Sequence, residues 1–252
     1  MQCGLPASGG LPCLWQASPL LRKPITLIQN GGIHPMNLHT LCLRHPSIPY
    51  VAPFVLFAIF TTIGPLFPVS ALIIYPVKTV LVAASLLYFW RFYQKEMKCT
   101  FDWLAVASGV FVFLIWVSPE GLYPQLGHSE FNPFEKGSGF PAYLAITFRL
   151  AGASLVVPVM EELFWRSFAL RFVIHSDFKS IPLGRFSWLS FVLISLLFGF
   201  EHHRWLVGIL AGMAYAGVLY RRKNLFAPIL SHGITNLLLG IYVLSTKQWS
   251  FW

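Results

Sequence analysis

The stretch AYLAITFRLAGASLVVPVMEELFWRSFALRFVI, residues 142–174, decides the fold class. It continues for 33 residues with few charged positions. A helix needs about 20 apolar residues to cross the hydrocarbon core of a bilayer. The stretch therefore predicts a membrane-crossing helix, and its extra length requires a tilt, a bend at Pro158 or an interfacial beginning.

The composition of the whole chain agrees with this prediction. Of its 252 residues, 56 % are hydrophobic and only 11 % are charged, and the mean hydropathy is +0.65. A soluble domain carries roughly 25 % charged residues, while disordered chains, coiled coils and collagens need more charge or a short repeat. We therefore expect an all-α fold, a polytopic transmembrane helical bundle.

Six further apolar runs accompany residues 142–174, which predicts about seven spans. The third and fifth runs along the chain are short, and we expect their ends to extend into flanking residues. The six runs are Pro49–Phe67, Val69–Trp90, Trp103–Val117, Phe186–Phe200, Trp205–Tyr220 and Asn224–Leu244.

The basic residues predict one orientation. Alternate connecting segments carry 12 Lys and Arg residues against 3 in the others, and cytoplasmic loops are the basic ones. The N-terminus is therefore expected in the cytoplasm, and the net charge of +9 does not indicate a nucleic-acid partner. Lys78 and Arg149 lie inside spans, where we expect them to snorkel or to pair; Arg149 could instead meet Glu161 or a peptide carboxylate.

The chain divides into three parts by composition. Residues 1–47 form an N-terminal extension that we expect to be disordered, and translation could begin at Met36. Residues 48–140 hold three spans, and residues 141–252 hold the four spans that carry the polar motifs. The four cysteines have neither a metal-type spacing nor a disulfide pattern.

Three ionisable residues lie within one span, in the segment Met160–Arg166. Such groups are costly inside a bilayer and mark functional sites. Glu162 and Arg166 are one helical turn apart and are expected to pair. Glu161 points about 100° away, since a helix has 3.6 residues per turn, and stays available for chemistry. The alternative interpretation is a structural ion network between helices.

Two further polar motifs lie on other spans. His202 follows the fifth span, and His232 and Asn236 are one turn apart on the seventh. A carboxylate beside an imidazole can deprotonate water, and His or Asn donors suit an oxyanion. The residues thus suffice for peptide hydrolysis by activated water. The alternatives are an interfacial histidine at 202 and an interhelical hydrogen bond at His232 and Asn236.

Together the three motifs, Glu-Glu-x-x-x-Arg, Phe-x-x-x-His and His-x-x-x-Asn, resemble those of the CAAX prenyl protease and bacteriocin-processing (CPBP) intramembrane endopeptidases. The resemblance extends from about Pro141 to Trp252 and is similar to the exosortase-associated bacterial subgroup, which implies a bacterial inner membrane. It implies the following roles: Glu161 as the base, His202 as its partner, His232 and Asn236 as oxyanion donors, and Glu162 with Arg166 as a supporting pair. His203 is a supporting candidate or a substitute for His202.

Metal dependence is a separate question. Glu161, His202 and His232 would form an acceptable zinc set, but this assignment leaves Glu162 and Asn236 without roles. We therefore favour a metal-free glutamate mechanism without a cofactor. The expected partners are the lipid bilayer and a peptide or protein substrate, which could be lipidated or membrane-anchored. The alternatives are a non-catalytic scaffold or immunity protein of this fold, and a proton-coupled carrier.

Overall fold

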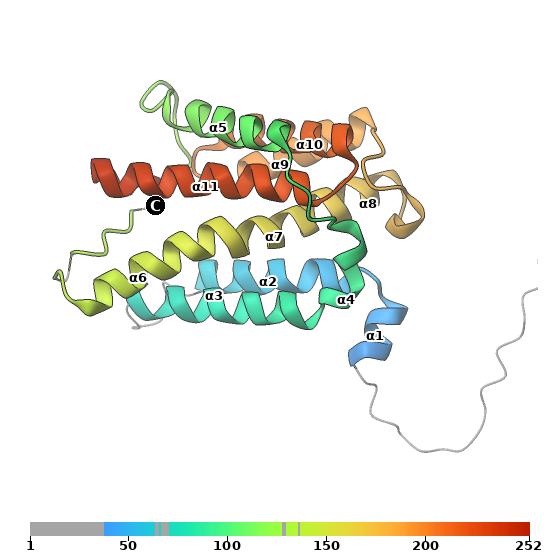
Figure 1. Ribbon diagram of the computed structural model, residues 1–252, viewed down its shortest axis with the longest axis horizontal. Coiled ribbons are helices and arrows are strands. Elements are labelled where there is room, and N and C mark those ends of the chain that lie inside the picture. The colour runs from blue at the N-terminus through green and yellow to red at the C-terminus, as the bar shows by residue number, and fades with distance from the viewer. Residues whose placement is uncertain (1–37, 64–65, 67–70, 128–129, 136) are drawn as a thin grey trace, which may run out of the picture. The chain divides into compact units, whose positions relative to one another are not determined.

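The structure is a computed structural model that describes residues 38–63, 66, 71–127, 130–135 and 137–252. The regular structure in these residues is helical (Figure 1). Residues 37–252 form one compact unit. The predicted start at Met36 and most of the predicted extension lie outside the described residues; within 1–47, Leu38–Arg44 form helix α1.

Each predicted apolar run corresponds to a helix. The first run overlaps α2 (Ile48–Ile63), the second contains α3 (Ala71–Tyr88), and the third is α5 (Trp103–Val117). Short helices connect some of them: α4 (Trp90–Tyr93) and η2 (Gln94–Glu96) follow α3. The last three runs correspond to α9 (Trp188–Phe200), α10 (Trp205–Arg222) and α11 (Phe226–Thr246), of which α10 and α11 end two residues later than predicted. The short helix η5 (Phe178–Ser180) precedes α9, and η6 (Trp249–Phe251) follows α11.

The fourth run is one continuous helical segment with two π-helical parts. It consists of α6 (Phe140–Ala151), the π segment η3 (Gly152–Val156), α7 (Val157–Glu162), the π segment η4 (Leu163–Ala169) and α8 (Leu170–Ile174). Pro158 lies in the first turn of α7, directly after η3, where a missing backbone N–H is tolerated.

The prediction of about seven spans is not supported. Within the described residues, two helical segments are long and apolar enough to cross a membrane, Phe140–Ile174 and Phe226–Thr246, and two bent helix pairs raise the number to at most four. Helices α5 and α9 have 15 and 13 residues and do not extend as expected. Asp102 caps α5 by accepting a hydrogen bond from the Leu104 amide, which fixes its beginning. The protein is nonetheless a helical membrane protein.

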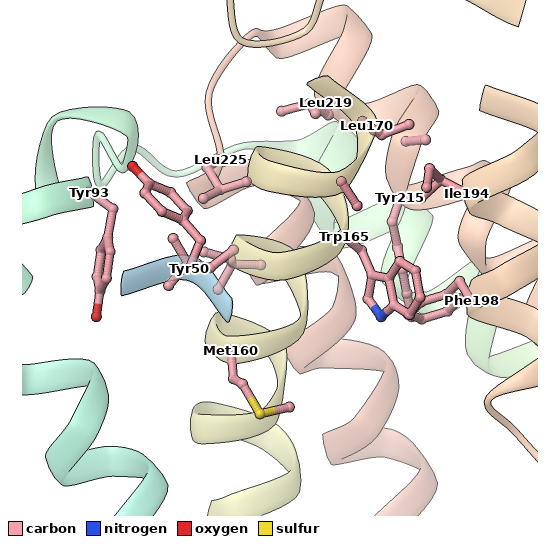
Figure 2. Close-up of a cluster of buried hydrophobic side chains, with 14 of the residues drawn as sticks. Tyr50, Tyr93, Met160, Trp165, Leu170, Ile194, Phe198, Tyr215, Leu219 and Leu225 are labelled. Atoms are coloured by element: carbon pink, nitrogen blue, oxygen red, sulfur yellow. The ribbon is translucent and has the colours of Figure 1, made fainter. Parts of the chain in front are cut away.

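The helices pack around the segment 140–174 (Figure 1). α2 and α3 lie on one side of it, and α11 on the other side contacts α5 and α10. α11 comes close to the π segment η3, since a Cβ on Gly233 would lie 2.8 Å from the Ser154 carbonyl oxygen. Figure 2 shows the aromatic part of the core, where Trp165, Phe198 and Tyr215 from three different elements lie together.

Candidate active site

Glu161 and Glu162 lie at the end of α7, between the two π segments. Both side chains are buried, although the surrounding core is apolar. Single π turns within α-helices are rare and frequently mark functional sites. The Glu161 Oε2 atom is buried without a hydrogen-bond partner in the described part of the chain. Glu161 is therefore a carboxylate that the fold leaves uncommitted.

Glu162 is the centre of a buried ion network. Its Oε2 atom lies 3.1 Å from Arg166 Nε, the pairing that the spacing predicts. Its Oε1 atom lies 3.0 Å from His232 Nδ1, a contact across 70 residues of sequence. The Arg166 guanidinium also covers the Phe198 ring at 4.1 Å. The network joins the segment 140–174 to α11.

His232 lies between the two glutamates. With Nδ1 facing the Glu162 carboxylate, this nitrogen carries the hydrogen and donates it. The other nitrogen, Nε2, lies 4.0 Å from Glu161 Oε2. The imidazole ring stacks on Tyr215, with centroids 4.7 Å apart. The orientation of the His232 ring is therefore fixed by the hydrogen bond to Glu162 at its edge and by the stacking on Tyr215 at its face.

His202 lies in the turn between α9 and α10. Its Nδ1 atom is 2.7 Å from the Phe198 carbonyl oxygen, so Nδ1 is the protonated nitrogen and Nε2 carries the lone pair. Burial lowers the pKa of His202 to about 4, which keeps the ring neutral near pH 7. The Trp116 ring meets the imidazole edge-on at 5.5 Å. His202 is thus arranged to accept a hydrogen bond through Nε2.

Asn236 contacts the π segment η3. Its Nδ2 atom donates a hydrogen bond to the Ala153 carbonyl oxygen at 2.8 Å. An amide nitrogen has two hydrogens, so the second is available to another acceptor. The hydrogen bond to Ala153 therefore fixes the plane of the Asn236 amide and leaves one N–H group of this amide free to donate.

One cavity of about 190 Å³ joins these residues. Four of the predicted site residues line it: Glu161, His202, His232 and Asn236. The rest of the lining is mainly aromatic or aliphatic, with one further cation, Arg149. Glu162 and Arg166 support the site through His232 without lining the cavity.

His203 is not among the cavity-lining residues. Its Nδ1 atom contacts the Leu126 carbonyl oxygen, and its own carbonyl accepts a hydrogen bond from the Leu126 amide at 2.8 Å. The structure therefore places His203 against the segment that follows α5, away from Glu161.

The zinc set considered from the sequence was Glu161, His202 and His232. In the described residues, no group of three or more His, Cys, Asp or Glu side chains is arranged to hold a metal ion.

Some residues of the site were not found from the sequence. Tyr215 is buried and stacks on His232, but it belongs to none of the three motifs. Its position as a tyrosine among the small residues of 208–217 was the feature of the sequence that could have indicated it. Trp165 donates a hydrogen bond to Glu201 at 3.1 Å. Both contacts depend on how different helices meet, which the local sequence does not indicate.

The chain matches a protein-family model over part of its length. Residues 143–238 match the family model described as "Type II CAAX prenyl endopeptidase Rce1-like". The matched range contains the motif residues from Glu161 to Asn236. No significant match was found among curated proteins or among solved structures.

Proposed function

We propose that this chain is a membrane protease that hydrolyses peptide bonds with water activated by Glu161, since residues 143–238 match the family model of the Rce1-like CAAX endopeptidases. The observation that carries the proposal is the shared cavity, which brings the uncommitted Glu161 carboxylate together with His202, His232 and Asn236. The substrate is a peptide or protein segment that enters this apolar cavity, and a lipidated or membrane-anchored segment suits it.

In the proposed reaction, Glu161 takes a proton from water while the water oxygen attacks the scissile carbonyl carbon. His202 assists by accepting a hydrogen bond from this water through Nε2. The C–N bond then breaks, and Glu161 returns the proton to the leaving amine. General acid–base catalysis of this type contributes about 10²–10⁴-fold to the rate.

The oxyanion that forms at the carbonyl is stabilised by His232 and Asn236 in this mechanism. Because His232 Nδ1 donates to Glu162, its Nε2 atom donates only when the ring is an imidazolium. The mechanism therefore requires a protonated His232 beside the Glu161 and Glu162 carboxylates. Asn236 supplies its second amide hydrogen.

We propose the glutamate mechanism over a zinc mechanism because it gives each motif residue a role. Glu162 and Arg166 hold His232, and Asn236 acts as a donor. In a zinc site made of Glu161, His202 and His232, Asn236 has no clear role.

The test is cleavage of a fluorogenic peptide panel by purified protein in liposomes, with prenylated, unmodified and exosortase-tail peptides. Wild type is compared with Glu161→Gln and Glu161→Ala, with and without a chelator. Glu135→Gln, a change at an exposed glutamate, is the matched control. We expect the Glu161 variants to lose about 10²–10⁴-fold in kcat, and the control and the chelated wild type to keep their activity.

Two other outcomes would change the assignment. Loss of wild-type activity with the chelator, restored by zinc, would establish a metalloprotease. No cleavage of any peptide by a folded wild type, with peptide binding retained in Glu161→Ala, would favour the non-catalytic scaffold.

A further inference from the structure

Phe251 and Trp252 follow α11 and line the same cavity as Glu161. The two residues are only 8 % and 7 % exposed, so their rings pack into the protein. Both positions lie outside the range 143–238 that matches the family model. The motifs therefore do not account for this part of the cavity wall.

The chain reverses its direction after α11 and brings Phe251 back to the cavity. Lys247, which caps α11, has the left-handed backbone conformation with φ 59°, and its amide donates a hydrogen bond to the Val243 carbonyl oxygen at 2.8 Å. The short helix η6 follows, and the Phe251 ring meets the Tyr242 ring of α11 edge-on at 5.7 Å. Phe251 thus contacts the last turns of the helix that it follows, which fixes its place beside the cavity.

Arg204 holds Phe251 from the turn that contains His202. Its Nη1 atom donates a hydrogen bond to the Ser250 carbonyl oxygen at 2.8 Å, and its guanidinium carbon lies 3.9 Å from the centre of the Phe251 ring. Its Nε and Nη2 atoms bind the Glu120 carboxylate at 2.9 and 2.8 Å. Because all three guanidinium nitrogens have partners and Arg204 is buried, this planar cation has one fixed position. The Phe251 ring is therefore held in place by the residue that precedes α10.

A second cation holds Trp252 from α6. The Arg149 guanidinium lies 5.3 Å from the centre of the Trp252 ring and 4.8 Å from that of the Tyr75 ring, distances at which a cation is attracted to the ring face. The expected contact of Arg149 with Glu161 is not an ion pair in the described part of the chain. Lys78 Nζ lies 4.6 Å from the same Tyr75 ring, and its side chain is buried, so the expectation that it snorkels is wrong. The two aromatic residues of this wall are thus held from two different helices.

We propose that Phe251 limits the size of the substrate side chain that the cavity of Glu161 accepts, and that Arg204 positions Phe251. Pockets that enclose a whole drug-sized ligand have volumes of about 300–1,000 Å³, so a cavity of about 190 Å³ admits only a small part of a peptide. Replacing the phenyl ring on its wall by a methyl group leaves that space to the substrate. Phe251 is a specificity-determining residue in this proposal, which rests on the proposed function.

The first experiment uses a peptide that the wild type cleaves, prepared with alanine, leucine or tryptophan on either side of the scissile bond. Phe251→Ala should raise the ratio of kcat/KM for the tryptophan peptide to that for the alanine peptide by about 10–200-fold, the range in which an apolar pocket discriminates size. The change should appear mainly in KM, because the groups that act on the scissile bond are intact. Phe251→Trp should lower the same ratio.

The role of Arg204 is tested with the same peptides. Arg204→Ala removes the contact with the Phe251 ring and should raise the ratio in the same direction as Phe251→Ala. Arg204→Lys keeps a cation near the ring and should restore part of the wild-type ratio. A lower stability of Arg204→Ala without a change in the ratio would show that Arg204 only stabilises the fold, and would overturn its positioning role.

Two controls separate selectivity from stability. Phe140→Ala and Arg221→Ala change exposed residues that do not line the cavity, and both should leave the ratio unchanged. Thermal unfolding in detergent shows whether each variant is folded, and Phe251→Leu, which keeps an apolar side chain, replaces Phe251→Ala if the latter does not fold. An unchanged ratio in the folded Phe251 variant, or an equal change for the large and the small peptide, would overturn the proposal.

The second experiment does not depend on cleavage. Binding of the same peptides is measured on Glu161→Gln with Phe251 intact and with Phe251→Ala added. A preference for the smaller side chain that disappears with Phe251→Ala, without cleavage by the wild type, would support the size limit and contradict the protease. Cleavage by the wild type with a selectivity that Phe251→Ala does not alter would contradict the size limit and support the protease.

Discussion

The imidazole of His232 lies almost parallel to the phenol ring of Tyr215, with an angle of 18° between the planes and 4.7 Å between the centroids. The two residues come from α11 and α10. Since Glu162 holds the edge of the same imidazole, the stacking fixes the remaining rotation of the ring. The geometry of the proposed oxyanion donor therefore depends on a residue outside the motifs.

This stacking leads to the first prediction. Tyr215→Phe keeps the ring and should retain most of the wild-type kcat, whereas Tyr215→Leu should reduce kcat about 10–100-fold, because small misplacements of a catalytic group are costly. Peptide cleavage measures kcat, and Tyr143→Leu, at an exposed tyrosine, is the matched control. Wild-type kcat in a folded Tyr215→Leu would show that the stacking is irrelevant to catalysis.

The second prediction concerns the buried Arg166. Arg166→Ala leaves the Glu162 carboxylate without its guanidinium partner at 0 % exposure, which should cost about 3–5 kcal/mol of unfolding free energy. The double variant Arg166→Ala with Glu162→Gln removes the unpaired charge and should be more stable than Arg166→Ala alone. Denaturant unfolding in detergent measures both. If the single variant is the more stable of the two, the ion pair does not stabilise the fold.

The third prediction is a pH dependence outside the membrane helices. Arg204 binds Glu120 through Nη2 at 2.8 Å and Nε at 2.9 Å, and these hydrogen bonds lower the pKa of the Glu120 carboxyl below 4.5. A lowered pKa in the folded state adds stability above the unfolded pKa, and this stability is lost as the pH falls through the folded pKa. Glu120→Gln should therefore lower Tm at pH 7, and the difference from wild type should shrink below about pH 4.5.

The exposed Glu135 provides the control for this measurement, because Glu135→Gln removes the same charge without an arginine partner. Its Tm should follow the wild-type Tm over the same pH range. A Tm difference for Glu120→Gln that is constant from pH 7 to pH 3 would contradict the linkage to Glu120 ionisation.

The fourth prediction concerns Glu96, which connects four parts of the chain. Its carboxylate accepts hydrogen bonds from Arg171 at 2.9 and 3.1 Å and from Tyr50 at 3.2 Å, and it also contacts Ser167 and Lys179. Arg171 is buried, so Glu96→Ala leaves it unpaired and should cost about 3–5 kcal/mol. Lys95→Ala, one residue earlier and exposed, should leave the unfolding free energy within about 0.5 kcal/mol of wild type.

The fifth prediction concerns orientation. The basic segments predict that residues 221–223 face the cytoplasm and that Lys247 faces the opposite side. Arg221→Cys and Lys247→Cys are placed separately in a chain whose four native cysteines are replaced by serine. An impermeant maleimide added to intact cells should label only the second. Labelling of the first alone would reverse the assigned orientation.

The positions of the helices could be predicted from the sequence, but the number of helices that cross the membrane could not. Each apolar run corresponds to a helix, and Trp103–Val117 has the predicted bounds. The number of membrane spans could not be predicted from the apolar runs. A helix crosses a membrane only if it continues for enough residues, and short helices such as α9 do not. The bend of 111° between α1 and α2 was not predicted, although Pro46 in the break between them is a local signal for the end of a helix.

For the site, spacing within one helix was more informative than contacts between helices. The pairing of Glu162 with Arg166 follows from their separation by one helical turn, because ion pairs at this spacing are local. The contact of Glu162 with His232 crosses 70 residues, so nothing in the local pattern indicates it. The same holds for the aromatic surroundings of Arg149, whose rings come from three separate parts of the chain.

The π segment η3 has a consequence for how this chain tolerates change in length. A π turn holds one residue more than an α turn, so deleting Leu155 would convert η3 to ordinary helix without breaking the segment. Because the extra residue is taken up within one turn, the residues after the deletion would keep nearly the same orientation relative to α6. Glu161 and Arg149 would therefore still line one cavity. A deletion that left η3 unchanged would instead turn every later residue by about 100° relative to α6. A change of one residue in chain length is thus tolerated at η3, without separating Glu161 from Arg149.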